Sequence, residues 1–106
     1  MNAPYLGIEI GGTKLQLVRG DDTAAIRARR RLDVDRARGG AGIRAQIKLA
    51  LAEWAPAGPL RAAGVGFGGP VDWRTGRIAL SHHVEGWSEF ELGSWLRELT
   101  GCPVQV

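Results

Sequence analysis

The chain has 106 residues, a formal net charge of +3, 44% hydrophobic residues and 24% charged residues, which is ordinary for one soluble globular domain. No apolar run approaches the ~18 residues that a membrane-spanning helix needs, and the first residues lack a signal-peptide pattern. The single cysteine, Cys102, excludes an internal disulfide and fits a reducing compartment. We therefore expect a cytoplasmic protein without a membrane partner.

The positive charge comes mainly from arginines that are concentrated between residues 27 and 38. Such a cluster could neutralise the phosphates of a nucleic acid. However, no aromatic residue is interleaved to stack on bases, and a solvated strand and loop explains the same residues. We expect no nucleic-acid partner.

The first third of the chain predicts an antiparallel β-meander. Residues 5–10 and 15–18 have strand character, and the glycine pair between them is typical of a hairpin turn. Residues 20–22 form the next turn, and residues 25–34 are a third strand.

The rest of the chain predicts alternating strands and helices. Apolar residues at helical spacing between residues 43 and 54 indicate a helix behind the glycine pair at 39–40, and residues 62–67 form a strand. A turn at residues 75–76 joins two short strands. Ser88 and Glu91 make a capping box for a second helix, whose apolar stripe consists of Leu92, Trp95, Leu96 and Leu99.

A final strand begins at Val104. Because strands separated by helices pair in parallel with right-handed crossovers, the expected fold is a single α/β domain over residues 1–106. It has a mixed five-stranded sheet, in which the meander is followed by a β-α-β-α-β unit.

The most informative segment is residues 9–14, with the sequence EIGGTK. Gly11 and Gly12 let backbone N–H groups approach an anion closely, while Thr13 adds a hydroxyl donor and Lys14 a positive charge. Glu9 offers an oxygen ligand for Mg²⁺. The segment therefore predicts a phosphate-binding loop, with an ordinary hairpin turn as the alternative.

The same segment nearly matches a Walker A loop, but its last two residues are reversed and β-prone residues follow it where that loop opens a helix. In a hairpin at the amino end, it resembles instead the first phosphate motif of the ROK sugar kinases, in the actin-like ATPase superfamily. Glu9 replaces the Asp that is usual there.

Further landmarks in the same order extend the resemblance along nearly the whole chain. Residues 64–72 resemble the family's strand and sugar-side glycine loop, and residues 75–78 the hairpin that follows it. Residues 86–92 resemble the Pro-Gly-Trp segment that leads into a helix, with Glu85 in place of the proline. Residues 102–106 resemble the strand that leads to the family's Asn-Asp pair.

The resemblance implies the N-terminal lobe of an RNase H-like, actin-like fold, incomplete at its C-terminal end. It implies that Glu9, Gly11, Gly12, Thr13 and Lys14 bind ATP, with Glu9 also binding Mg²⁺. The sugar-side residues implied are Gly68, Gly69, Pro70, His82 and His83, although a histidine pair is more often an ordinary part of a surface loop.

The family's catalytic Asp belongs to the Asn-Asp pair, which we expect after Val106, and its zinc motif also lies further on. We interpret Asp72, the nearest substitute, as a turn residue. No catalytic residue is therefore nominated within the chain.

We expect the N-terminal lobe of an ATP-dependent, glucokinase-like hexose kinase, inactive by itself. One alternative is the sugar-binding lobe of a ROK transcriptional regulator, although only four residues precede the first strand and leave no room for a DNA-binding helix-turn-helix. Another is a non-catalytic binding module. We also expect homo-oligomerisation, with Val104 and Val106 left exposed on a strand without a covering helix.

Overall fold

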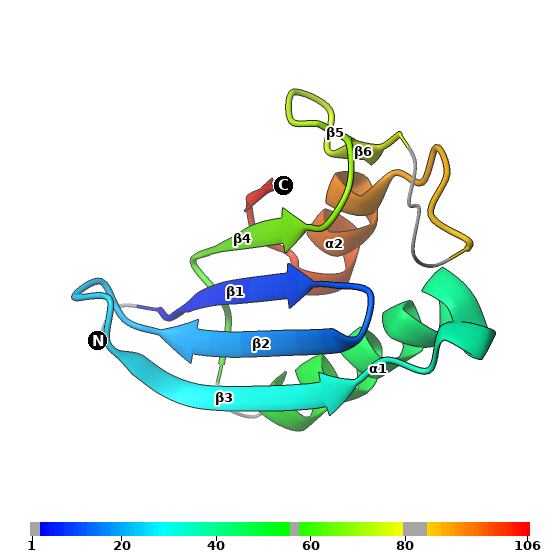
Figure 1. Cartoon of the computed structure of the whole chain (residues 1–106). Helices are drawn as coiled ribbons and strands as arrows, with labels where there is room; N and C mark the ends of the chain where they lie inside the picture. Colours follow the sequence, from blue (N-terminus) through cyan, green and yellow to red (C-terminus); the bar gives the residue numbers. More distant parts are fainter. Residues whose placement is uncertain (1–2, 56–57, 80–84) are drawn as a thin grey trace.

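The fold is that of a computed structural model, which describes residues 3–55, 58–79 and 85–106. Figure 1 shows the elements, which follow one another as β1 (Tyr5–Ile10), β2 (Lys14–Gly20), β3 (Ile26–Asp33), the short 3₁₀ helix η1 (Arg36–Arg38), α1 (Gly39–Trp54), β4 (Ala62–Phe67), β5 (Val71–Asp72), β6 (Arg77–Ile78), α2 (Leu92–Thr100) and β7 (Val104–Gln105).

The main sheet has five strands in the order β3-β2-β1-β4-β7. β1 pairs antiparallel with β2, and β2 with β3, whereas β1 pairs in parallel with β4, and β4 with β7. β5 and β6 form a separate hairpin. The predicted mixed five-stranded sheet is confirmed, and so are the meander and the parallel second half.

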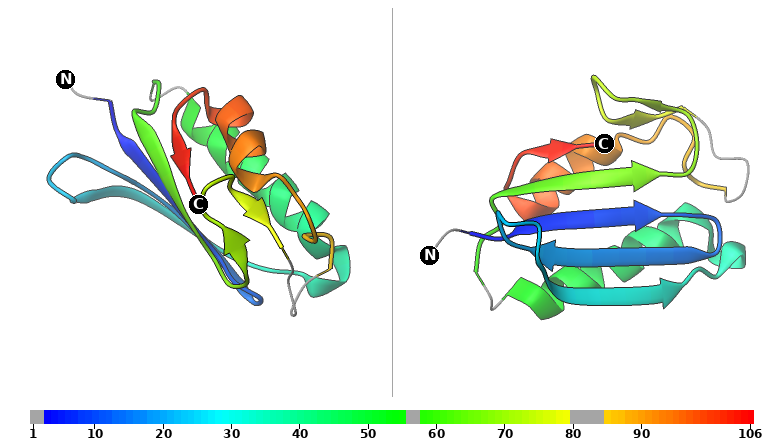
Figure 2. Two further views of the ribbon diagram at one scale, coloured as in Figure 1. Left: turned by 90° about the horizontal axis from the view of Figure 1, so that it is seen from above. Right: turned by 60° about the vertical axis from the view of Figure 1, so that its left-hand side comes forward.

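Side chains alternate across the central strands, so that one face of the sheet is apolar. Both helices cover this face, and Figure 2 shows them on the same side of the sheet. The buried core residues from the strands and helices include Leu6, Ile8, Ile10, Leu15, Leu17, Ile43, Ile47, Leu92 and Leu96. The opposite face carries no helix among the described residues, and none of the described helices is long and apolar enough to cross a membrane.

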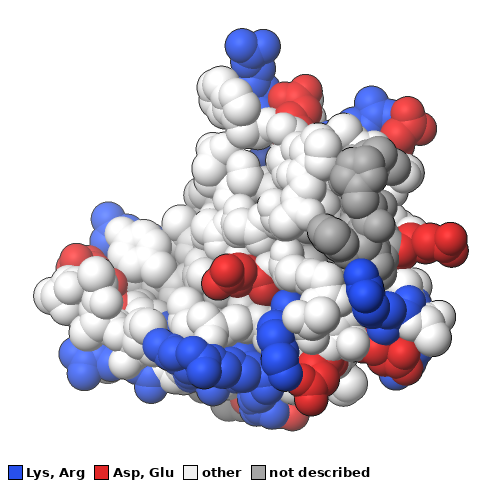
Figure 3. Space-filling view, viewed as in Figure 1, with Lys and Arg blue, Asp and Glu red and all other residues white. Residues whose placement is uncertain are grey.

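The arginine-rich segment is the edge strand β3. Arg30 points toward the helices and pairs with Glu53 of α1, whereas Arg27, Arg29 and Arg31 are exposed. Figure 3 shows Lys and Arg side chains along this edge of the molecule. Charged side chains on an edge strand discourage pairing with another sheet, which agrees with the interpretation of a solvated strand.

Two predicted details of α2 and β7 are wrong. α2 begins at Leu92, with no side-chain cap, because residues before it pair with the hairpin instead: Ile78 N–H donates to the Phe90 carbonyl at 2.8 Å. Ser88 therefore caps no helix. Val104 is buried, at 7% exposure, because α2 packs over β7, so it offers no surface to a partner.

We expect Leu96→Ala to lower the free energy of unfolding by about 2–5 kcal/mol, because Leu96 is fully buried between α2 and the sheet. The matched variant Leu49→Ala removes the same atoms from a side chain that is 69% exposed. It should change the free energy by less than about 0.5 kcal/mol. Urea denaturation followed by circular dichroism measures both, and equal effects would show that α2 does not pack on the core as described.

Candidate functional site

Two glycine loops meet where the parallel strands β1 and β4 end. The Gly68 N–H donates to the Ile10 carbonyl at 3.0 Å, and a Cβ at Gly68 would lie 4.0 Å from the Gly11 Cα. Ligands of open α/β sheets bind at the carboxyl ends of the strands. The two segments that the sequence predicts to bind phosphate and sugar are therefore adjacent.

The first loop is a hairpin turn between β1 and β2, as predicted, and no helix follows it. The Gly11 N–H donates to the Lys14 carbonyl at 3.0 Å and closes the turn, and the Thr13 carbonyl accepts from Val34 N–H at 2.9 Å. Within the described part of the chain, no hydrogen bond from the amides of Gly12 or Thr13 is found. The Gly11 amide is thus engaged within the turn, whereas those of Gly12 and Thr13 have no internal acceptor in this part of the structure.

A cleft of about 1000 Å³ extends from this loop across the uncovered face of the sheet. Its floor includes Gly7, Gly64 and Gly66. A Cβ at Gly64 or Gly66 would meet no atom within 4 Å, so the glycines leave space above the strands. Glu9 also lines the cleft and is exposed there.

The cationic groups of the cleft come from β2 and β3. Lys14 forms an ion pair with Asp33, and both side chains are largely exposed. The hydrogen bond and the charge of Lys14 hold the pKa of Asp33 below its usual value. Because exposed ion pairs contribute little, an incoming anion can compete with Asp33 for Lys14.

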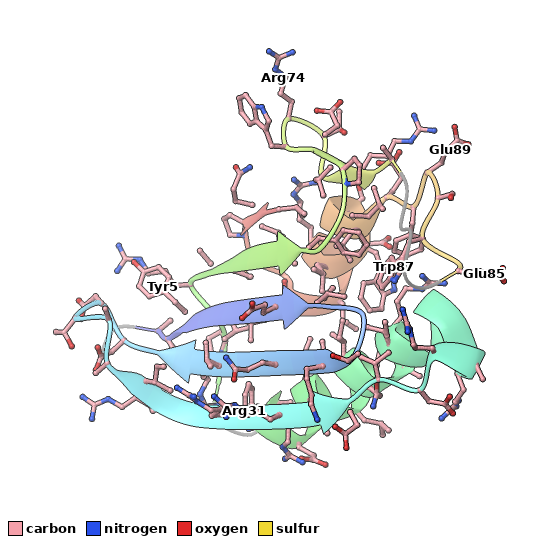
Figure 4. All side chains as sticks on the ribbon, viewed as in Figure 1. Tyr5, Arg31, Arg74, Glu85, Trp87 and Glu89 are labelled. Carbon is pink, nitrogen blue, oxygen red and sulfur yellow. The ribbon has the colours of Figure 1, made fainter. Side chains whose placement is uncertain are left out.

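Arg31 is a cleft residue that the sequence reasoning missed. Its Nε donates to the Gln16 side chain at 2.6 Å across the β2–β3 pair, and Figure 4 shows it on the uncovered face. The alternation of β3 could have indicated this position, but only the pairing register shows that it faces the cleft.

The second loop continues β4 into the hairpin. Gly69 N–H donates to the Phe67 carbonyl at 2.9 Å, and the Pro70 carbonyl accepts from Ala79 N–H at 3.0 Å. Asp72 is the last residue of β5, and its side chain accepts from Arg74 N–H at 3.0 Å in the turn that follows. His82 and His83 lie outside the described residues.

The described residues contain no cluster of three or more His, Cys, Asp or Glu side chains suited to a metal. Glu9 lines the cleft next to the predicted phosphate-binding loop, and Asp33, which is paired with Lys14, lines the same cleft. This arrangement fits Mg²⁺, which binds through one or two carboxylates together with water and phosphate oxygens, and does not suggest a metal site formed by protein groups alone.

Comparison with known proteins establishes the family. The model of the ROK family matches residues 5–106. The chain belongs to the ROK family. No match is found among curated proteins.

Solved structures of ROK proteins share the fold. The Lmo2764 protein of Listeria monocytogenes, a proposed N-acetylmannosamine kinase, superposes with a TM-score of 0.84 at 26% identity, over 96% of this chain and 34% of that one. The ROK glucokinase of Streptomyces griseus, solved with glucose and AMPPNP, gives a TM-score of 0.82 at 24% identity, over 98% of this chain and 32% of that one.

A ROK transcriptional regulator, a homologue of the E. coli MLC protein, gives a TM-score of 0.81 at 17% identity, over 100% of this chain and 28% of that one. The chain therefore spans about a third of the length of these proteins. It corresponds to the N-terminal part of the kinases, with its actin-like fold. Its fold is common to kinases and regulators of the family.

We expect Lys14→Met to raise the pKa of the Asp33 carboxyl toward the ordinary value of about 3.9, because the variant removes both the hydrogen bond and the charge that lower it. Carboxyl-carbon NMR titration measures this shift. Asp21 is the internal control, since its low pKa depends on Thr23 and Arg27 and should not change. An unaltered Asp33 titration would mean that the pair does not form in solution.

Proposed function

We propose that this chain is the N-terminal lobe of an ATP-dependent sugar kinase, which transfers a phosphoryl group to a hexose hydroxyl. The observation that carries the proposal is the contact between the two glycine loops at the ends of β1 and β4. Phosphoryl transfer requires the donor phosphate and the acceptor hydroxyl to be held in line at short range. Adjacent loops, one for each substrate, meet that requirement.

The roles of the residues follow from their positions. The amides of Gly12 and Thr13 donate to phosphate oxygens, and Lys14 adds a positive charge that is only weakly held by Asp33. Glu9 would hold Mg²⁺, directly or through water, and the metal would neutralise the charge on the phosphates. Gly68, Gly69 and Pro70 form the side of the site assigned to the sugar.

We infer that the general base for the sugar hydroxyl lies outside this sequence. The Asp72 carboxylate accepts a hydrogen bond from the turn that follows β5, and the Asp33 carboxylate is paired with Lys14, so we assign the base to neither. By resemblance to the family, the base is the Asp of the Asn-Asp pair after Val106. The lobe by itself should then bind substrates weakly and lack activity.

The regulator is the second candidate, because part of the MLC homologue has the same fold as this chain. A regulator needs the sugar side of the site but no reaction at the phosphate-binding loop. Turnover of a hexose by the complete protein, with one ADP released for each sugar phosphate formed, supports the kinase. Sugar binding without turnover supports the regulator or a non-catalytic binding module.

An ATP-dependent kinase acts where ATP is abundant, so we infer a cytoplasmic location. The single cysteine, buried in the core, fits a reducing compartment. We also propose a homo-oligomer, with contacts through surfaces other than the buried Val104.

In the complete protein, we expect Gly12→Val to raise the KM for ATP by about tenfold or more. The branched side chain would obstruct the approach of phosphate to the amides of Gly12 and Thr13, and one charge-assisted hydrogen bond is worth about 1.5–3 kcal/mol. A coupled assay of ADP release measures the effect. Gly12→Ala, a smaller obstruction, should have an intermediate KM. An unchanged KM in a folded Gly12→Val protein would place the phosphate elsewhere.

Replacing Glu9 tests the metal assignment separately. We expect Glu9→Gln to raise the Mg²⁺ concentration needed for half-maximal activity, because an amide is a weaker ligand for a hard cation than a carboxylate. Glu9→Asp, which restores the residue usual in the family, should keep the Mg²⁺ requirement close to that of the wild type. A Glu9→Gln protein with an unaltered Mg²⁺ dependence would remove Glu9 from the metal site.

A further inference from the structure

Trp87 supports the end of β4 from the side of the helices. It is 1% exposed, and its ring contacts Phe67 edge to face, with a centroid distance of 5.2 Å. Phe67 is the last residue of β4 and lines the cleft. The loop at Gly68 and Gly69 therefore leaves the sheet directly above a buried aromatic contact.

The segment that carries Trp87 is attached to the first turn of α1. Gly40 N–H donates to the Glu85 carbonyl at 2.6 Å, and a Cβ at Gly40 would lie only 2.9 Å from the Gly86 carbonyl oxygen. The two glycines that the sequence suggests as a break before the helix are thus its first residues. Because these glycines have no side chain, the segment at Glu85 and Gly86 can lie directly against the first turn of α1. In Figure 4, Trp87 points inward from the segment and Glu85 points away from the molecule.

Arg44 of α1 holds the same segment through three contacts. Its Nη1 donates to the Gly86 carbonyl at 3.0 Å. Its guanidinium carbon lies 5.0 Å from the ring centroid of Trp87 and 4.1 Å from that of Phe90. Partial burial lowers the pKa of Arg44, but a guanidinium remains charged at neutral pH. No ion pair of Arg44 is found among the described residues.

We propose that Arg44 is a positioning residue for the sugar-side loop: it fixes Trp87 beneath Phe67 and thereby fixes Gly68 and Gly69 at the end of β4. The effect of Arg44 on KM rests on the proposed function, whereas its effect on the position of the loop does not. The first loop does not depend on Arg44, because the Gly11–Lys14 hydrogen bond and the β1–β2 pairing hold it. Loss of Arg44 should therefore affect the sugar more than the nucleotide.

The chain contains a matched control at the other end of α1. Arg19 lies 5.6 Å from the ring centroid of Trp54 and donates to the Trp54 carbonyl at 3.4 Å. It thus makes the same two kinds of contact as Arg44, but Trp54 lines a different pocket, which contains neither glycine loop. Arg19→Met and Arg44→Met remove equivalent interactions at the two ends of the helix.

The first measurement is hydrogen exchange of the complete protein, read at the amides of Gly68 and Gly69. These amides donate to the carbonyls of Ile10 and Phe67, so their exchange reports local opening of the loop. We expect Arg44→Met to speed the exchange of these two amides by about tenfold, because the loss of one typical hydrogen bond changes an equilibrium by about that factor. Arg19→Met should leave it unchanged. Equal exchange in Arg44→Met and the wild type would overturn the proposal, whether or not the protein is a kinase.

The second measurement separates positioning from general destabilisation. We expect Arg44→Met to raise the KM for the hexose severalfold, with the KM for ATP within about twofold of the wild type, whereas a loss of folded protein would lower kcat and leave both KM values unchanged. Arg44→Lys, which keeps the charge over the rings, should have a KM for the hexose between those of the wild type and Arg44→Met.

Equal changes in the KM values for the hexose and for ATP, or the same change in Arg19→Met, would overturn the proposal for Arg44. Absence of turnover in the wild type would contradict the proposed function, and the exchange result would still decide the role of Arg44.

Discussion

The parallel pairing of β1 with β4 determines where both glycine loops lie. In this register Ile10 is opposite Phe67, so the two strands end at the same level and their loops leave the sheet side by side. The hydrogen bond from Gly68 N–H to the Ile10 carbonyl continues the pairing by one residue into the second loop. A shift of this register would separate the loops and turn the apolar side chains of a strand away from the helices.

The uncovered face of the sheet follows from the same strands. Their alternate positions are apolar toward α1 and α2 and mostly small or polar toward the cleft, where Gly64 and Gly66 leave room above the backbone. Because both helices pack on one side, the cleft is open along the sheet. The ROK proteins that share this fold are about three times as long as the chain, and the proposed catalytic base belongs to that additional part.

The predictions that succeeded depended on local patterns. The glycine pair at Gly11 and the strands on either side of it indicated a hairpin, and the structure has one. The charged residues of β3 indicated a solvated strand, and β3 is an edge. The capping box at Ser88 was wrong because the residues before Leu92 bond to the β5–β6 hairpin, a contact that no local pattern reveals. Val104 was expected to be exposed, yet α2 covers it.

Local patterns in the amino-acid sequence were thus sufficient for the strands, the helices and the hairpin turn at Gly11 and Gly12, because turn chemistry and apolar periodicity act over a few residues. They could not show that Arg31 faces the cleft, that Gly39 and Gly40 begin a helix, or that Arg44 of α1 lies over the ring of Trp87. Each of these facts depends on segments that are distant along the chain and meet only after the sheet and helices pack. The shape of the site is a property of that packing, whereas its chemical groups are already visible in the sequence.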